Sequence, residues 1–107
     1  MRGSLMLVVL LMASDVQALS VTLRVTVPEP TPDTVYVAGD FQGWNPGDPA
    51  YALERVDERV HAITLDFDPG TQIQFKFTRG SWDLVEKGPE GQEIGNRVLT
   101  LNESRTY

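Results

Sequence analysis

Cysteine is missing from the 107 residues, and basic residues are outnumbered by acidic ones. Without cysteine the chain has no disulfide framework, no thiolate metal site and no cysteine nucleophile, so packing alone must stabilise the fold. Nine lysines and arginines stand against 15 acidic residues, which gives a formal net charge of −6. Because this charge repels phosphate backbones and anionic lipid headgroups, nucleic acids and membranes are not expected partners. A neutral polymer would not be repelled.

Histidine is almost as scarce, which makes an enzymatic site hard to assemble. The one histidine, His61, has no serine or cysteine nearby in the sequence, and no G-x-S-x-G elbow is present. We interpret it as a packing or surface residue. Asp66 and Asp68 could suggest a carboxylate pair or calcium ligands, but the glycine-turned loop of calcium sites is missing and a solvated strand end is favoured. The sequence predicts a non-catalytic protein without metal or cofactor.

Only one long apolar run is present, the eight residues 5–12. It follows Arg2 and precedes Val16-Gln17-Ala18, the order of charge, apolar stretch and small-residue cleavage site found in secretory signal peptides. Eight apolar residues are too few for a membrane anchor, which needs about 20. We expect residues 1–18 to be a signal peptide and residues 19–107 to be a single secreted or periplasmic domain.

The rest of the chain shows apolar residues that alternate with polar ones, the period of a half-buried strand. This alternation predicts strands near residues 21–27, 35–38, 60–67, 72–78, 82–85 and 97–101. Pro69 and Gly70 are placed for a type II turn between two of them. The pattern favours an all-β fold, an immunoglobulin-like antiparallel β-sandwich of about seven strands. The expected core includes Ile63, Leu65, Ile73, Phe75 and Phe77.

Two tryptophans stand at positions where the local pattern does not call for a large apolar side chain. Trp44 lies in a loop rich in glycine, proline and aspartate, and Trp82 follows Gly80-Ser81. Aromatic rings pack against the C–H face of a pyranose much as they stack on bases, a contact of about 1–3 kcal/mol by analogy with nucleotide stacking. Burial in the core is the alternative, and composition alone leaves both interpretations open.

Four short motifs follow one another along the chain. They are residues 39–44 (Gly-Asp-Phe-Gln-Gly-Trp), residues 75–77 (Phe-Lys-Phe), Trp82, and residues 95–97 (Gly-Asn-Arg). By these motifs and their order, the stretch from about residue 21 to residue 101 resembles the starch-binding domains of carbohydrate-binding module family 20 and the related family 48, which includes the glycogen-binding domain of AMP-activated kinase β subunits.

The resemblance implies a monomeric module that binds starch, glycogen or a related α-glucan and that can be linked covalently to a catalytic domain. Trp44 and Trp82 would be stacking platforms, and Lys76 and Asn96 would donate hydrogen bonds to glucose hydroxyls. Tyr36 matches a tyrosine of a second glucan site in some members, with Tyr51 as its only apparent aromatic partner.

Two other functions remain open from the sequence. The chain could be a protein-interaction sandwich, or an accessory domain of a secreted hydrolase without glucan binding, in which the tryptophans are scaffold. The exposure of the two rings would separate these functions from sugar binding. Asn102-Glu103-Ser104 also forms a glycosylation sequon.

Overall fold

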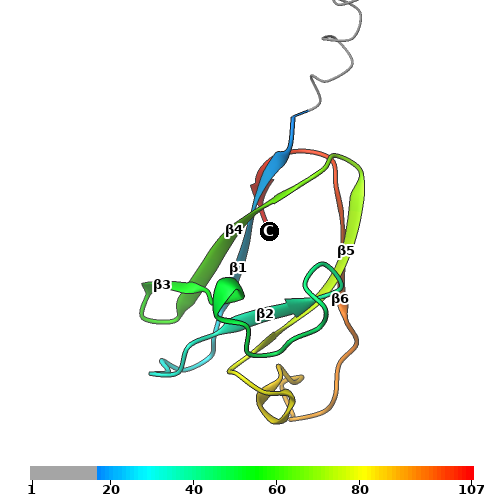
Figure 1. Ribbon diagram of the computed structural model, residues 1–107. Coiled ribbons are helices and arrows are strands. Elements are labelled where there is room, and N and C mark those ends of the chain that lie inside the picture. Colours follow the sequence, from blue (N-terminus) through cyan, green and yellow to red (C-terminus); the bar gives the residue numbers. More distant parts are fainter. Residues whose placement is uncertain (1–16) are drawn as a thin grey trace, which may run out of the picture.

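A computed structural model of the protein describes residues 17–107, and the predicted signal peptide falls almost entirely outside them. Seven strands form two sheets that make a sandwich (Figure 1). The larger sheet, in the order β3-β4-β1-β7, consists of β1 (Leu19–Thr26), β3 (Glu54–Asp57), β4 (Val60–Phe67) and β7 (Arg105–Thr106). The smaller sheet, in the order β2-β5-β6, consists of β2 (Tyr36–Gly39), β5 (Thr71–Thr78) and β6 (Arg97–Leu101). The predicted all-β sandwich is confirmed.

Alternation along the strands builds the core between the sheets. In β5 the side chains of Ile73, Phe75 and Phe77 are buried, while those between them are less buried or exposed. Ile63 and Leu65 of β4 pack against this core but are only partly buried. The buried cluster comprises Val21, Leu23, Val35, Val37, Leu53, Ile73, Phe75, Phe77 and Leu101.

The turn between β4 and β5 has the geometry that its sequence predicts. Gly70 has a φ of 86°, and the N–H of Thr71 donates to the carbonyl of Asp68 at 3.2 Å. A positive φ at the third position defines a type II turn, so this prediction is confirmed. The turn carries the chain from β4 in the larger sheet to β5 in the smaller sheet, where β5 pairs antiparallel with β2 and β6.

Four features differ from the sequence-based expectation, and one of them is β3, which lies where no strand was expected. Residues 82–85 are not a strand: Trp82–Leu84 form a single 3-10 turn, η2, and only Val85 pairs, in an isolated bridge to Thr78. No sequence pattern indicated β7, which is two residues long and pairs parallel to β1. A second 3-10 turn, η1 (Pro49–Tyr51), begins after Asp48, whose side chain accepts from the N–H of Ala50. Among residues 17–107 there is no helix long and apolar enough to cross a membrane.

Candidate functional site

The two tryptophans lie beside each other although 38 positions separate them in the chain. Their ring centroids are 6.4 Å apart and their planes are inclined by 41°. Trp82 is 43% exposed, and Trp44 is half-buried. The tertiary structure therefore brings together an inclined aromatic pair with surface available to a ligand.

The loop after β2 presents Trp44 because it winds around the side chain of Gln42. The amide oxygen of Gln42 accepts from the N–H of Gly39 at 3.1 Å and from the N–H of Asn45 at 2.8 Å. Its amide nitrogen donates to the carbonyl of Asn45 at 3.0 Å. The N–H of Trp44 also donates to the carbonyl of Gly39, at 3.0 Å. This network holds the loop in place through hydrogen bonds.

Trp44 itself has an unusual backbone. Its φ is 57°, and it is the only residue other than glycine with a positive φ among residues 17–107. Gly43 before it has a φ of 76°. A bulky residue in the left-handed region is strained, at a cost of about 1–3 kcal/mol, and such residues cluster at functional sites. A function of the Trp44 ring other than packing the core would explain why a tryptophan occupies this strained position.

Thr78, at the end of β5, holds the two tryptophan loops together. Its hydroxyl donates to the carbonyl of Pro46, two residues after Trp44, and accepts from the N–H of Gly80, two residues before Trp82, at 3.1 Å. The loops approach so closely that a Cβ added to Gly47 would lie 2.6 Å from the carbonyl oxygen of Gly80. Thr78 is itself buried.

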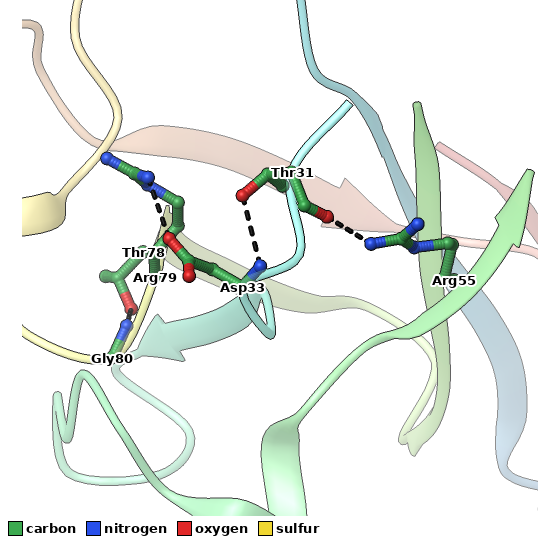
Figure 2. A network of polar contacts seen from close by, with 6 residues as sticks. All are labelled: Thr31, Asp33, Arg55, Thr78, Arg79 and Gly80. Carbon is green, nitrogen blue, oxygen red and sulfur yellow. Dashed lines mark hydrogen bonds and ion pairs between the residues drawn. The ribbon is translucent and has the colours of Figure 1, made fainter. Parts of the chain in front are cut away.

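A second set of polar contacts ties the Trp82 loop to the connector before β2 (Figure 2). The guanidinium of Arg79 lies 2.9 Å from the carboxylate of Asp33. In the same connector the carbonyl of Thr31 accepts from the Arg55 guanidinium of β3, and the Thr31 hydroxyl accepts from the N–H of Asp33 at 3.1 Å. The Trp82 loop is thus braced by the connector as well as by the Trp44 loop.

Lys76 lies on the outer face of β5, opposite Ala38 of β2. Its buried neighbours Phe75 and Phe77 point to the core, as the alternation predicted. Within residues 17–107 its ammonium group forms no ion pair, so its donors remain available. The side chain is half-buried.

Asn96 is exposed, and its amide nitrogen donates to the side-chain oxygen of Gln74 at 3.3 Å. Since Phe75 pairs with Arg97 in the β5–β6 register, Asn96 comes next in line opposite Lys76. The outer face of β5 therefore runs from Thr78, under the tryptophan loops, through Lys76 to Gln74 beside Asn96. The four residue steps from Thr78 to Gln74 span about 13 Å, the scale of a short oligosaccharide rather than of one sugar.

Ion pairs hold the segment that carries Asn96, residues 86–96. Glu86 accepts from the N–H of Phe77 at 2.6 Å and from the Nε of Arg97 at 2.9 Å. Across this segment the ammonium of Lys87 pairs with the carboxylate of Glu93, and the hydrogen bond between them lowers the pKa of Glu93.

The two tyrosines of the predicted second site have different neighbours. The Tyr36 ring lies beside Gly80, 3.7 Å from an ideal Cβ at that position. The Tyr51 ring packs on Phe41 with centroids 5.8 Å apart, in a pocket of about 300 Å³ that also includes Asp66. These contacts do not join the tyrosines, and a second sugar site at Tyr36 and Tyr51 stays a prediction.

Sequence reasoning missed the residues that organise the site. None of the residues that hold these parts in place was an expected site residue. Gln42 holds the Trp44 loop, Thr78 joins the two tryptophan loops, and Gln74 bonds to Asn96. Gln42 offered one signal, since an amide side chain in a glycine-rich loop can bond to nearby backbone. Thr78 and Gln74 could be recognised only by their place on the outer face of β5.

His61 belongs to the core rather than to this site. It is 2% exposed in β4, and within the described chain its Nε2 has no hydrogen-bond partner. Burial lowers the pKa of His61, and the charge of Arg55, its partner across β3 and β4, lowers it further. Its predicted role as a packing residue agrees with this position.

Comparison with known proteins gives short matches to long enzymes. The chain is 46% identical over 92 residues to an alpha-amylase of Niallia circulans, covering 84% of this chain and 7% of that protein. It is 44% identical over 90 residues to amylopullulanases of Thermoanaerobacter thermohydrosulfuricus and Thermoanaerobacterium thermosulfurigenes, covering 81% of this chain and 6% and 5% of theirs. The chain thus corresponds to a small part of each relative. No family model matches.

Among solved structures, a glycoside hydrolase family 15 glucoamylase from Hypocrea jecorina contains a similar fold. The TM-score is 0.62 at 18% identity, and the match covers 84% of this chain and 16% of the glucoamylase. At this identity the likeness concerns the fold alone.

Proposed function

We propose that the domain is a non-catalytic carbohydrate-binding module that recognises starch, glycogen or a related α-glucan. The observation that carries the proposal is the inclined pair of Trp44 and Trp82, held at the surface by two hydrogen-bonded loops at the cost of a strained backbone. Such a pair offers two faces to successive sugar rings of a curved chain. Lys76 and Asn96 would donate to hydroxyls of the same ligand.

The relatives support a role beside an amylolytic enzyme. They are an alpha-amylase and two amylopullulanases, and the chain matches only 5–7% of each, the proportion expected of an accessory unit in a large enzyme. We extend this to a module that acts outside the cytoplasm and is linked to, or works with, a catalytic domain. Removal of residues 1–18 would release it, and N-terminal sequencing beginning near Leu19 would support that step.

Affinity electrophoresis tests the proposal, in gels that contain amylopectin, dextran or no polysaccharide. We expect amylopectin alone to retard the protein. Trp82→Ala should lose most of this retention, and Lys76→Ala should lose less, because its hydrogen bonds compete with water. Val56→Ala, which trims another exposed apolar side chain on β3, should be retained like the unmodified protein.

Melting temperatures of the same proteins decide between sugar binding and a scaffold role for the ring. Trp82→Ala should melt close to the unmodified protein, because nearly half of the Trp82 side chain is exposed. Full retention of Trp82→Ala on amylopectin would refute the platform. A large loss of stability would instead favour a scaffold role, as in a protein-interaction domain.

A further inference from the structure

A groove of about 570 Å³ opens between β1 and the segment that follows β5. Its lining includes the apolar side chains of Val25, Val27, Val35, Phe77 and Val85. Charged side chains of both signs, among them Glu29, Lys87 and Arg97, also line it. None of the four proposed sugar contacts lines it. The groove is thus a separate feature of the surface.

The backbone of β1 is open along this groove. β7 pairs with β1 only at Val21 and Thr22, and Tyr107 extends the pairing by one step. The N–H of Tyr107 donates to the carbonyl of Thr22 at 2.7 Å, and its carbonyl accepts from the N–H of Arg24 at 2.8 Å. Figure 1 shows the carboxyl terminus ending part-way along β1.

The next backbone groups on this side of β1 are the carbonyl of Arg24 and the N–H of Thr26. Backbone groups alternate in direction along a strand, and the N–H of Val27 points to the other side, where it donates to the carbonyl of Arg59. Within residues 17–107 no strand pairs with β1 beyond Arg24 on the β7 side. The Arg24 carbonyl and the Thr26 N–H are therefore the acceptor and the donor with which a continuation of β7 would form the next pair of parallel hydrogen bonds.

We propose that this groove is a docking site for an extended peptide segment that continues β7 along β1. The residue two positions beyond Tyr107 would donate to the Arg24 carbonyl and accept from the Thr26 N–H. Tyr107 lies opposite Leu23 of β1 and packs against the core. By alternation, the residue two positions on would point inward beside Val25, into the groove.

The occupant is therefore an extended segment with apolar side chains at alternate positions, a mode of strand addition in which main-chain bonds give affinity and a pocket gives register. The matched part is only 5–7% of each relative, so those proteins contain much further polypeptide. This inference goes beyond the proposed sugar binding and does not depend on it.

Two extensions of identical composition test the proposal. Ser-Val-Ser-Val added after Tyr107 would direct its valines into the groove, whereas Val-Ser-Val-Ser would direct them to solvent. We expect the first to raise the melting temperature by about 4–8 °C over the unextended protein, and the second to leave it nearly unchanged. Equal melting temperatures of the two extended proteins would overturn the proposal.

Thr26→Pro provides the matched control. It removes the N–H that the extension would use, and proline is tolerated where a strand edge is open. It should change the unextended protein little and abolish the gain of the Ser-Val-Ser-Val form. A gain that persists in Thr26→Pro, or that grows with protein concentration because a second copy supplies the strand, would refute docking of the protein's own extension. Because melting temperature is the readout, failure here is distinct from failure of glucan binding.

Discussion

Trp44 combines a left-handed backbone with a partly buried aromatic ring that is not among the side chains packed against the core. Among the residues that the structure describes, every other positive φ belongs to glycine. Gly43 and Trp44 together turn the loop so that the ring meets Trp82. At this scale the proposed site includes one residue, Trp44, whose backbone costs stability, and strain of this kind clusters at functional sites.

Replacing Trp44 by asparagine and by alanine separates backbone strain from ring function. Asparagine tolerates the left-handed region better than alanine does. We expect Trp44→Asn to melt above Trp44→Ala and within about 4 °C of the unmodified protein. Both variants should lose most retention on amylopectin, since neither has a ring. Melting temperatures in the opposite order would show that backbone strain does not control stability at this position.

We expect the free energy of unfolding to depend on pH because of His61. Burial and Arg55 lower its pKa in the folded state, so the unfolded chain, with a histidine pKa of about 6.5, binds the proton more readily. The stability associated with neutral His61 is complete above that pH and is lost as the pH falls through the lowered folded pKa. We expect urea unfolding of His61→Gln to show a weaker loss of stability below pH 6.5 than the unmodified protein. Parallel curves for the two proteins would contradict this assignment.

At the scale of elements, β5 contributes side chains both to the core and to the outer face of the smaller sheet. Its inner side chains fill the core, and its outer ones, Gln74, Lys76 and Thr78, hold or form the site. The two tryptophan loops depend on this strand and on each other, because Thr78 bonds to both and Gly47 lies against Gly80. The distance between the two tryptophan rings therefore depends on how the two loops contact each other.

Gly47→Ala should disturb this spacing without touching either tryptophan. A Cβ at Gly47 would lie 2.6 Å from the Gly80 carbonyl, so the backbone of one loop must shift. We expect a loss of about 1–3 kcal/mol in stability and a clear loss of amylopectin retention. Val56→Ala is the control, because this exposed side chain lies on β3 in the other sheet. If the Gly47→Ala protein binds and melts like this control, the rigid loop pair is not needed for the site.

At the scale of the whole molecule, the proposed binding surface is open and shallow. The two tryptophan rings lie on loops at the end of the smaller sheet, and Lys76 and Asn96 lie on or beside its outer face. Such a surface suits a long flexible polymer, which passes over the domain without having to enter it.

An open surface also limits affinity. Two stacking contacts and a few hydrogen bonds of about 1 kcal/mol each must offset the ordering of a flexible sugar chain. Titration calorimetry with a soluble malto-oligosaccharide should therefore give a Kd between about 1 μM and 1 mM for one domain. A nanomolar Kd would mean that further contacts have been overlooked. Tighter retention on granules should need linked copies or a tethered enzyme.

The sequence by itself determined the elements with strong local signals. β1, β2, β4, β5 and β6 follow from the pattern of apolar residues, which a strand with one buried face satisfies. The turn at residues 68–71 follows from proline and glycine at positions that fix the backbone. Lys76 could be placed opposite Phe75 and Phe77 because side chains alternate along a strand. The motifs that contain Trp44 and Trp82 suggested a sugar site, and that suggestion rested on resemblance.

Only the tertiary structure decided how these elements meet. The segment at Trp82 is a 3-10 turn in a loop that packs against the Trp44 loop, which is far away in sequence. β7 is too short to be stable alone and exists because β1 offers it an edge. The 6.4 Å between the tryptophan rings comes from Thr78 joining two loops. Hydrogen bonds and close approaches between distant residues leave no periodic trace in a sequence, so they could be found only in three dimensions.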